Sequence, residues 1–159
     1  MQNHFSTSSQ DSYKPYIKFA LMLTISFVIM YGVMFLNAAE LSHIYLSNTR
    51  TYMTLLMISP MAILKLIFMS DMYKDKKLNI GIVILSVSVF ISALLFLRNQ
   101  TFIGDEQYMK AMIPHHSSAI LVSENATFKN AEVKQLSIEI IKAQEKEIAE
   151  MKKLLEVVE

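Results

Sequence analysis

The chain has 159 residues, of which 53% are hydrophobic and only 18% are charged, and its formal net charge is +1. This composition argues against an ordinary soluble domain, and no cluster of Lys and Arg points to nucleic acid. The sequence contains no cysteine, which excludes disulfides, thiolate metal sites and cysteine nucleophiles. Thioethers from its 12 methionines are therefore the only soft sulfur ligands available.

The chain begins with a polar segment, residues 1–18, whose first part is rich in serine. We expect residues 1–13 of this tail to be disordered, with His4 solvated. Three apolar segments follow, at 19–36, 51–73 and 80–97, and each is long enough to cross a hydrocarbon core of ~30 Å. Lysines precede the first of them as in a signal peptide, but its apolar run is longer and further spans follow. Residues 19–98 are therefore predicted to form a three-span membrane domain in contact with the lipid bilayer.

The charges of the loops predict the orientation of these spans. The loop KDKKLN at 74–79 carries three lysines, and the positive-inside rule places it in the cytoplasm. Lys14 and Lys18 put the N-terminus on the same side. We therefore expect an integral protein of the cytoplasmic (inner) membrane, with a cytoplasmic N-terminus and everything after Arg98 extracytoplasmic.

Methionines recur every fourth residue in the second span, at Met53, Met57 and Met61. Methionine is a flexible filler of apolar packing, which is the simpler interpretation of this spacing. The alternative is a thioether path that guides Cu(I) along the membrane. His43 lies in the loop between the first two spans, where we expect it to be solvated.

Residues 104–159 are predicted to form a helical hairpin. Asp105 can cap a first helix that runs to about Ser123, and ENATFKN at 124–130 is the turn. The second helix is amphipathic, because apolar residues recur at three- and four-residue steps from Val133 to Val158. Two helices bury their apolar stripes poorly alone. We expect the hairpin to pair with a second copy as a four-helix bundle or to lie against the spans.

The first helix of this hairpin carries the stretch MKAMIPHH at 109–116. Residues three and four apart share a helix face, so Met112 lies beside both His115 and His116, and Met109 lies one turn before Met112. Thioethers combined with imidazoles favour Cu(I), with Ag(I) as its mimic. The alternative is that the histidines only pack or face solvent and the methionines belong to the core.

The second helix carries polar residues within its apolar stripe. Gln144 stands where leucine would be expected, and Met151 falls two turns later with Glu147 between them. A buried glutamine needs a hydrogen-bond partner, and a neutral histidine of the first helix is a fitting one. We therefore expect Gln144 and Glu147 to orient the histidines and select their tautomer, while Met151 adds a thioether.

Both helices resemble the domain of unknown function 305 family, and the upstream segments look like its membrane-anchored branch. The matching residues are Met112, His115, His116, Ala119 and Ile120, followed by Ile140, Ile141, Gln144, Glu147, Ile148 and Met151. The resemblance implies a ferritin-like helical domain associated with copper handling and copper resistance. Its implied ligands here are Met112, His115, His116 and Met151, with Met109 as a weaker candidate. Many soluble members duplicate the His-His unit, and the single unit of this chain favours a homodimer.

Taken together, these patterns predict an all-α protein with three transmembrane helices and an extracytoplasmic two-helix hairpin over 104–159. We expect it to bind copper as Cu(I) and to buffer it or hand it to a copper-handling partner protein in copper tolerance. One alternative is a membrane-tethered assembly protein without a metal role, and another is an accessory to copper transport. No His-Glu-x-x-His, Gly-x-Ser-x-Gly or phosphate-loop motif is present, so we expect no enzymatic activity.

Overall fold

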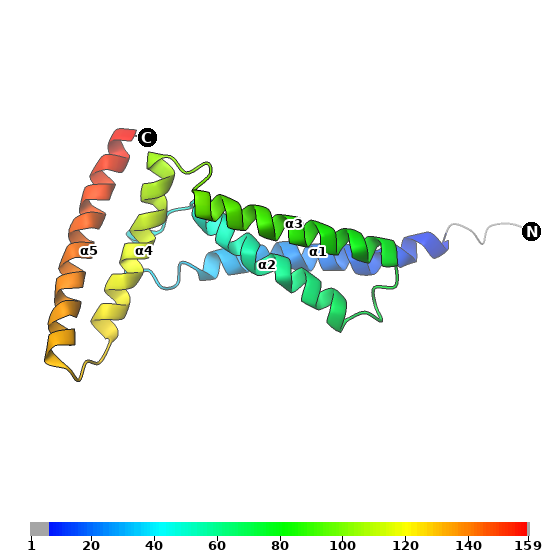
Figure 1. The fold of residues 1–159 in the computed structure, drawn as a ribbon, viewed down its shortest axis with the longest axis horizontal. Coiled ribbons are helices and arrows are strands. Elements are labelled where there is room, and N and C mark those ends of the chain that lie inside the picture. Colours follow the sequence, from blue (N-terminus) through cyan, green and yellow to red (C-terminus); the bar gives the residue numbers. More distant parts are fainter. Residues whose placement is uncertain (1–6, 159) are drawn as a thin grey trace, which may run out of the picture. The chain divides into compact units, whose positions relative to one another are not determined.

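A computed structural model describes residues 7–158, with side chains from Tyr13 onward, so His4 lies outside the described residues. Within this range the chain forms helices and no strands, which confirms the all-α class (Figure 1). The elements are α1 (Thr7–Val33), the 3-10 helix η1 (Leu41–His43), α2 (Asn48–Phe68), α3 (Lys76–Asn99), α4 (Asp105–Asn125) and α5 (Ala131–Val158). Helix α1 begins inside the segment that we expected to be a tail.

The chain divides into two compact units. The first contains the chain up to Met30 together with Tyr52–Arg98, and the second contains Tyr31–Thr51 together with the chain from Asn99 onward. The division falls within α1 and α2, so the loop between these helices belongs to the same unit as α4 and α5. This loop lies within residues 19–98, which are predicted from the sequence to form the membrane domain.

The first unit contains most of the three predicted spans. Among the described residues, three helical segments are long and apolar enough to cross a membrane, namely Tyr13–Val33, Asn48–Phe68 and Lys76–Asn99. Only 6% of the apolar window of the first segment and 11% of that of the third are buried by protein, against 33% for the second. Apolar side chains that the protein itself does not cover are stable in hydrocarbon, but their exposure to water is unfavourable.

Aromatic and polar contacts hold one end of this unit together. Tyr73, which follows α2, packs against Tyr16 and Phe19 of α1 at ring-centroid distances of 5.3 and 5.5 Å. The Tyr16 hydroxyl donates to Asn79 Oδ1 at 2.9 Å, and Asn79 Nδ2 donates to the Tyr73 carbonyl at 2.7 Å. These contacts fix the loop between α2 and α3 against α1.

The methionines of the second span face outward. Met53 and Met57 are each 41% exposed and Met61 is 36% exposed. The face that they form on α2 is therefore open at its surface and not enclosed by the other helices of the first unit. This arrangement gives no support for a thioether path between the helices of one copy of the membrane domain.

The second unit is built on α4 and α5, which lie side by side (Figure 1) and run in opposite directions. Near the turn, Ser137 Oγ donates to the Ser123 carbonyl at 3.2 Å. Asn130 caps α5, because its Oδ1 accepts from the backbone N–H groups of Glu132 and Val133 at 2.7 and 3.2 Å. At the start of α4 the capping position is Gly104, so Asp105 is the first helical residue and not the predicted cap.

A regular seam of α5 faces α4. Its residues alternate four- and three-residue steps, as in a coiled coil. They are Ser137, Ile141, Gln144, Ile148, Met151 and Leu155, all buried or half-buried. Three apolar residues of the predicted stripe lie beside this seam instead, and Val133, Leu136 and Ile140 are 47%, 55% and 36% exposed. Helix α5 thus has a second apolar face that α4 does not cover.

Candidate metal site

Helix α4 turns its methionines and histidines in different directions. Met109 is 6% exposed and belongs to the apolar core of the second unit, where Met151 packs against the same cluster. Met112 is half-buried, His115 is exposed and His116 is buried. Because adjacent helical residues point about 100° apart, only one histidine of the pair can face α5.

His116 is the histidine that faces α5, and both of its ring nitrogens are engaged. Nδ1 lies 2.9 Å from the carbonyl oxygen of Met112, one turn earlier on α4. Nε2 lies 2.7 Å from Oε2 of Glu147 on α5. The Met112 carbonyl can only accept, so Nδ1 is the donor in that contact. The two contacts hold the His116 ring at a fixed orientation across the helix interface.

The contact between His116 and Glu147 also sets the levels of the two methionines. In an antiparallel pair, one turn back along α4 corresponds to one turn forward along α5. Met112 is one turn before His116, and Met151 is one turn after Glu147. Both methionines are half-buried, and they lie at the same level of the helix pair, adjacent to the His116 level. Two thioethers, an imidazole and a carboxylate are thus grouped within two helical turns.

The other predicted site residues stand outside this group or at its edge. The ring centroids of His115 and His116 are 6.0 Å apart with an interplanar angle of 66°, and His115 points to solvent. Gln144 lies on the seam of α5, but the partner of the His116 imidazole is Glu147. Within residues 7–158, no group of three or more His, Asp or Glu side chains is placed to hold a metal ion. A metal at this site would therefore depend on thioethers.

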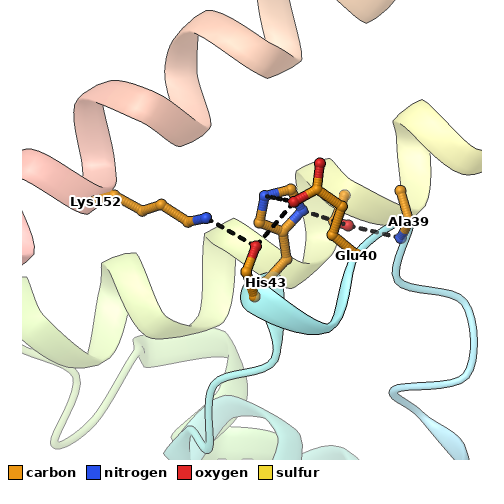
Figure 2. A network of polar contacts seen from close by, with 6 residues as sticks. Ala39, Glu40, His43 and Lys152 are labelled. Carbon is orange, nitrogen blue, oxygen red and sulfur yellow. Dashed lines mark hydrogen bonds and ion pairs between the residues drawn. The ribbon is translucent and has the colours of Figure 1, made fainter.

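A second polar cluster joins the loop before α2 to both helices (Figure 2), and the sequence did not predict it. The Ala39 N–H donates to Ser117 Oγ at 2.8 Å, and the Ser117 hydroxyl lies 2.9 Å from His43 Nδ1. Lys152 of α5 donates to Ser42 Oγ at 3.1 Å. His43 is only 7% exposed, so the expectation that it is solvated is wrong. The loop packs against Ser117 and withdraws the imidazole from water.

The surroundings of His43 favour its neutral form. The Ser117 oxygen already accepts from Ala39, so its hydrogen is free to be donated to Nδ1. Nε2 then carries the ring proton and faces Glu40 Oε2 at 3.6 Å. Burial lowers the pKa of His43 most, Lys152 lowers it further, and Glu40 acts in the opposite direction. The Glu-x-x-His spacing of Glu40 and His43 is a sequence signal that could have drawn attention to this pair.

The chain has two informative matches among known proteins. Residues 95–158 match the family model described as a domain of unknown function (DUF305). The chain is also 37% identical over 140 residues to the uncharacterized protein L153 of Acanthamoeba polyphaga mimivirus, across 86% of this chain and 90% of that protein. No solved structure matches the chain. The family model covers all of α4 and α5, and the viral relative extends the similarity over most of the membrane domain.

Proposed function

Because the chain belongs to the domain of unknown function 305 (DUF305) family, we propose that it is a membrane-anchored protein that binds Cu(I) between α4 and α5. In this role it buffers the ion or hands it to another protein in copper tolerance. Support comes from one observation above all, which is the position of His116. Its Nδ1 is held by the Met112 carbonyl, and its Nε2 points to α5 at the level next to Met112 and Met151.

The donor atoms favour a soft ion. Thioether sulfur and imidazole nitrogen suit Cu(I), whereas Mg²⁺ and Ca²⁺ prefer oxygen ligands. Holding Nδ1 on a backbone carbonyl directs Nε2 toward the metal, as in many protein metal sites. Met112, Met151 and His116 would supply the ligands, and Met109 is less suitable because it lies in the apolar core.

Glu147 controls access to this nitrogen. Its Oε2 lies 2.7 Å from Nε2, so Cu(I) bound at Nε2 would have to displace this carboxylate contact. The Glu147 side chain is 52% exposed, whereas that of His116 is 11% exposed. Glu147 can therefore turn toward solvent while the imidazole keeps its place, and protons compete with the metal.

A second copy of the chain would complete the helical domain. The exposed Val133, Leu136 and Ile140 lie beside the seam of α5, where a neighbouring helix can cover them. Pairing two α4–α5 units through these faces gives a ferritin-like four-helix bundle. His115 is exposed and adjacent to His116, so it is the ligand candidate that a partner copy or an acceptor protein can reach.

We place the α4–α5 pair on the extracytoplasmic side of a cytoplasmic membrane. Lys74, Lys76 and Lys77 lie in the loop between α2 and α3, and basic loops stay in the cytoplasm. With three spans, the N-terminus shares that side and the C-terminal helices lie opposite.

Competition with a chromogenic Cu(I) chelator under reducing conditions tests the proposal on the full-length protein in detergent. We expect tight binding that His116→Ala weakens at least tenfold, with a smaller loss for His115→Ala. His43→Ala is the matched control, because it removes a buried histidine outside the proposed site. Equal affinity of wild type and His116→Ala would exclude the proposed site.

The exposed apolar face of α5 also favours a second function, that of an assembly protein without a metal role. In that case Leu136→Glu with Ile140→Glu would abolish association with a partner helix, and His116→Ala would leave it unchanged. Loss of association without any Cu(I) binding by wild type would favour this alternative.

A further inference from the structure

The first unit contains a groove between α2 and α3 that the proposed metal site does not use. Two cavities of about 280 and 220 Å³ lie along it and share Ile63 as a lining residue. Figure 1 shows α2 and α3 diverging toward the loop that joins them, and the larger cavity lies at that end, beside Asn79. We call this feature the α2–α3 groove.

The walls of the groove are almost wholly apolar. Val83 and Ile84 line its larger part, and they are 36% and 61% exposed although they face a cavity between helices. Small side chains, Ser59 and Ser86, line the inner part together with Pro60. The Ser59 hydroxyl donates to the Leu55 carbonyl of its own helix at 2.6 Å, so it presents little polarity to the cavity. Such a groove fits a hydrocarbon chain.

The mouth of the groove is polar and carries positive charge. Asn79 lines it at the first turn of α3, and Lys74, Lys76 and Lys77 precede Asn79 directly. These lysines are exposed, and no ion pair engages them in the part of the chain that the structure describes. The nearby carboxylate of Asp75 accepts from the N–H groups of Lys77 and Leu78 at 2.9 and 3.1 Å, so it caps α3. The second acidic residue of the loop is Asp71.

We propose that the α2–α3 groove binds one anionic phospholipid, with an acyl chain between the helices and its phosphate at Lys74, Lys76 and Lys77. The charge of the mouth decides between occupants, because the membrane-spanning segments that a second copy could place in the groove contain no Asp or Glu to pair with the lysines. Basic residues at a membrane surface attract anionic lipids at about 1 kcal/mol each, which is about fivefold in affinity. The site lies in whichever leaflet contains this loop and does not depend on metal binding.

Native mass spectrometry of the full-length protein in detergent tests the site, with phosphatidylglycerol and phosphatidylcholine of identical acyl chains offered in equal amounts. We expect one retained lipid and a preference for phosphatidylglycerol of roughly a hundredfold, about fivefold for each lysine. Combined substitution of Lys74, Lys76 and Lys77 by Gln should remove that preference. The matched control substitutes Lys129, Lys134 and Lys142, which lie outside the first unit, and should keep it.

Filling the groove should remove the lipid whatever its headgroup. Val83→Trp places an indole in the cavity, and Ile84→Trp is a second variant from a more exposed position. Leu85→Trp is the control, because Leu85 is 64% exposed on the same helix and lines neither cavity. Equal retention of both lipids would overturn the headgroup site, and equal retention by the Val83, Ile84 and Leu85 variants would overturn the groove. A dimer that these groove variants dissociate would show that a second copy fills it instead.

Discussion

His116 of α4 and Glu147 of α5 are in contact across the helix interface, with Nε2 and Oε2 2.7 Å apart. The opposite side of the same imidazole is bonded to the Met112 carbonyl at 2.9 Å. The ring is therefore held at a fixed angle, and the nitrogen that a metal would use is protected by a carboxylate that can move. A metal ion bound at this nitrogen would have to displace the carboxylate.

The first prediction concerns the contact between Glu147 and Nε2. Glu147→Gln replaces a carboxylate contact with a weaker amide contact, so Cu(I) should reach Nε2 faster than in wild type. Stopped-flow transfer of Cu(I) from a chromogenic chelator measures the rate. Glu150→Gln, an exposed residue of the same helix, should behave as wild type. Equal transfer rates in the Glu147 and Glu150 variants would show that Glu147 does not protect this nitrogen.

The second prediction concerns the core that supports the site. Ile113 is fully buried between the helices, so Ile113→Ala should lower the stability of the second unit by about 2–5 kcal/mol. Hydrogen exchange of α4 and α5 amides, resolved by peptide, reports the change. Val122→Ala removes apolar atoms from a side chain that is 59% exposed and should have little effect. Similar losses of protection in both variants would mean that α4 and α5 do not pack as described.

The third prediction concerns the attachment of the loop. Ser117→Ala leaves the Ala39 N–H and the His43 ring without their partner, and the expected cost is about 1–3 kcal/mol. Hydrogen exchange of residues 37–47 should accelerate. Ser118→Ala is the matched control, since Ser118 bonds only the exposed Asn37 side chain. No difference between the two variants would contradict the buried network.

The fourth prediction concerns pH. Burial lowers the pKa of His43 below its ordinary value of 6.5, so the unfolded chain takes up this proton first. The stability of the second unit should therefore fall as the pH drops below 6.5 toward the pKa of folded His43. His43→Gln should flatten this dependence. Hydrogen exchange of residues 37–47, corrected for intrinsic rates and compared across about pH 5–7.5, measures the effect. A dependence unchanged in His43→Gln would assign it to another group.

The sequence predicted those parts of the fold that depend on local pattern. Hydropathy over long windows located the three spans, and the helical period located α4 and α5. It also identified His116 and Glu147 as neighbours of the site. The structure pairs His116 with Glu147 and not with Gln144. That choice depends on the register of two helices, which periodicity alone does not define.

The burial of His43 could not be predicted in the same way. It requires a loop to pack against Ser117, which is 74 residues away in the chain. A histidine in a polar loop has no hydrophobic period to indicate its neighbours. The exposure of Val133, Leu136 and Ile140 has a similar origin. The sequence predicts one apolar stripe along α5, but α4 covers only part of it and leaves these three residues open to solvent. Tertiary contacts decide both outcomes.

X-ray absorption at the copper edge tests the central claim most directly. Full-length protein loaded with one equivalent of Cu(I) should show a mixed nitrogen and sulfur shell. Met112→Leu with Met151→Leu should remove the sulfur scatterers, and His116→Ala should remove the nitrogen scatterer. A shell that none of these substitutions changes, or a protein that retains no Cu(I), would contradict a copper site between α4 and α5.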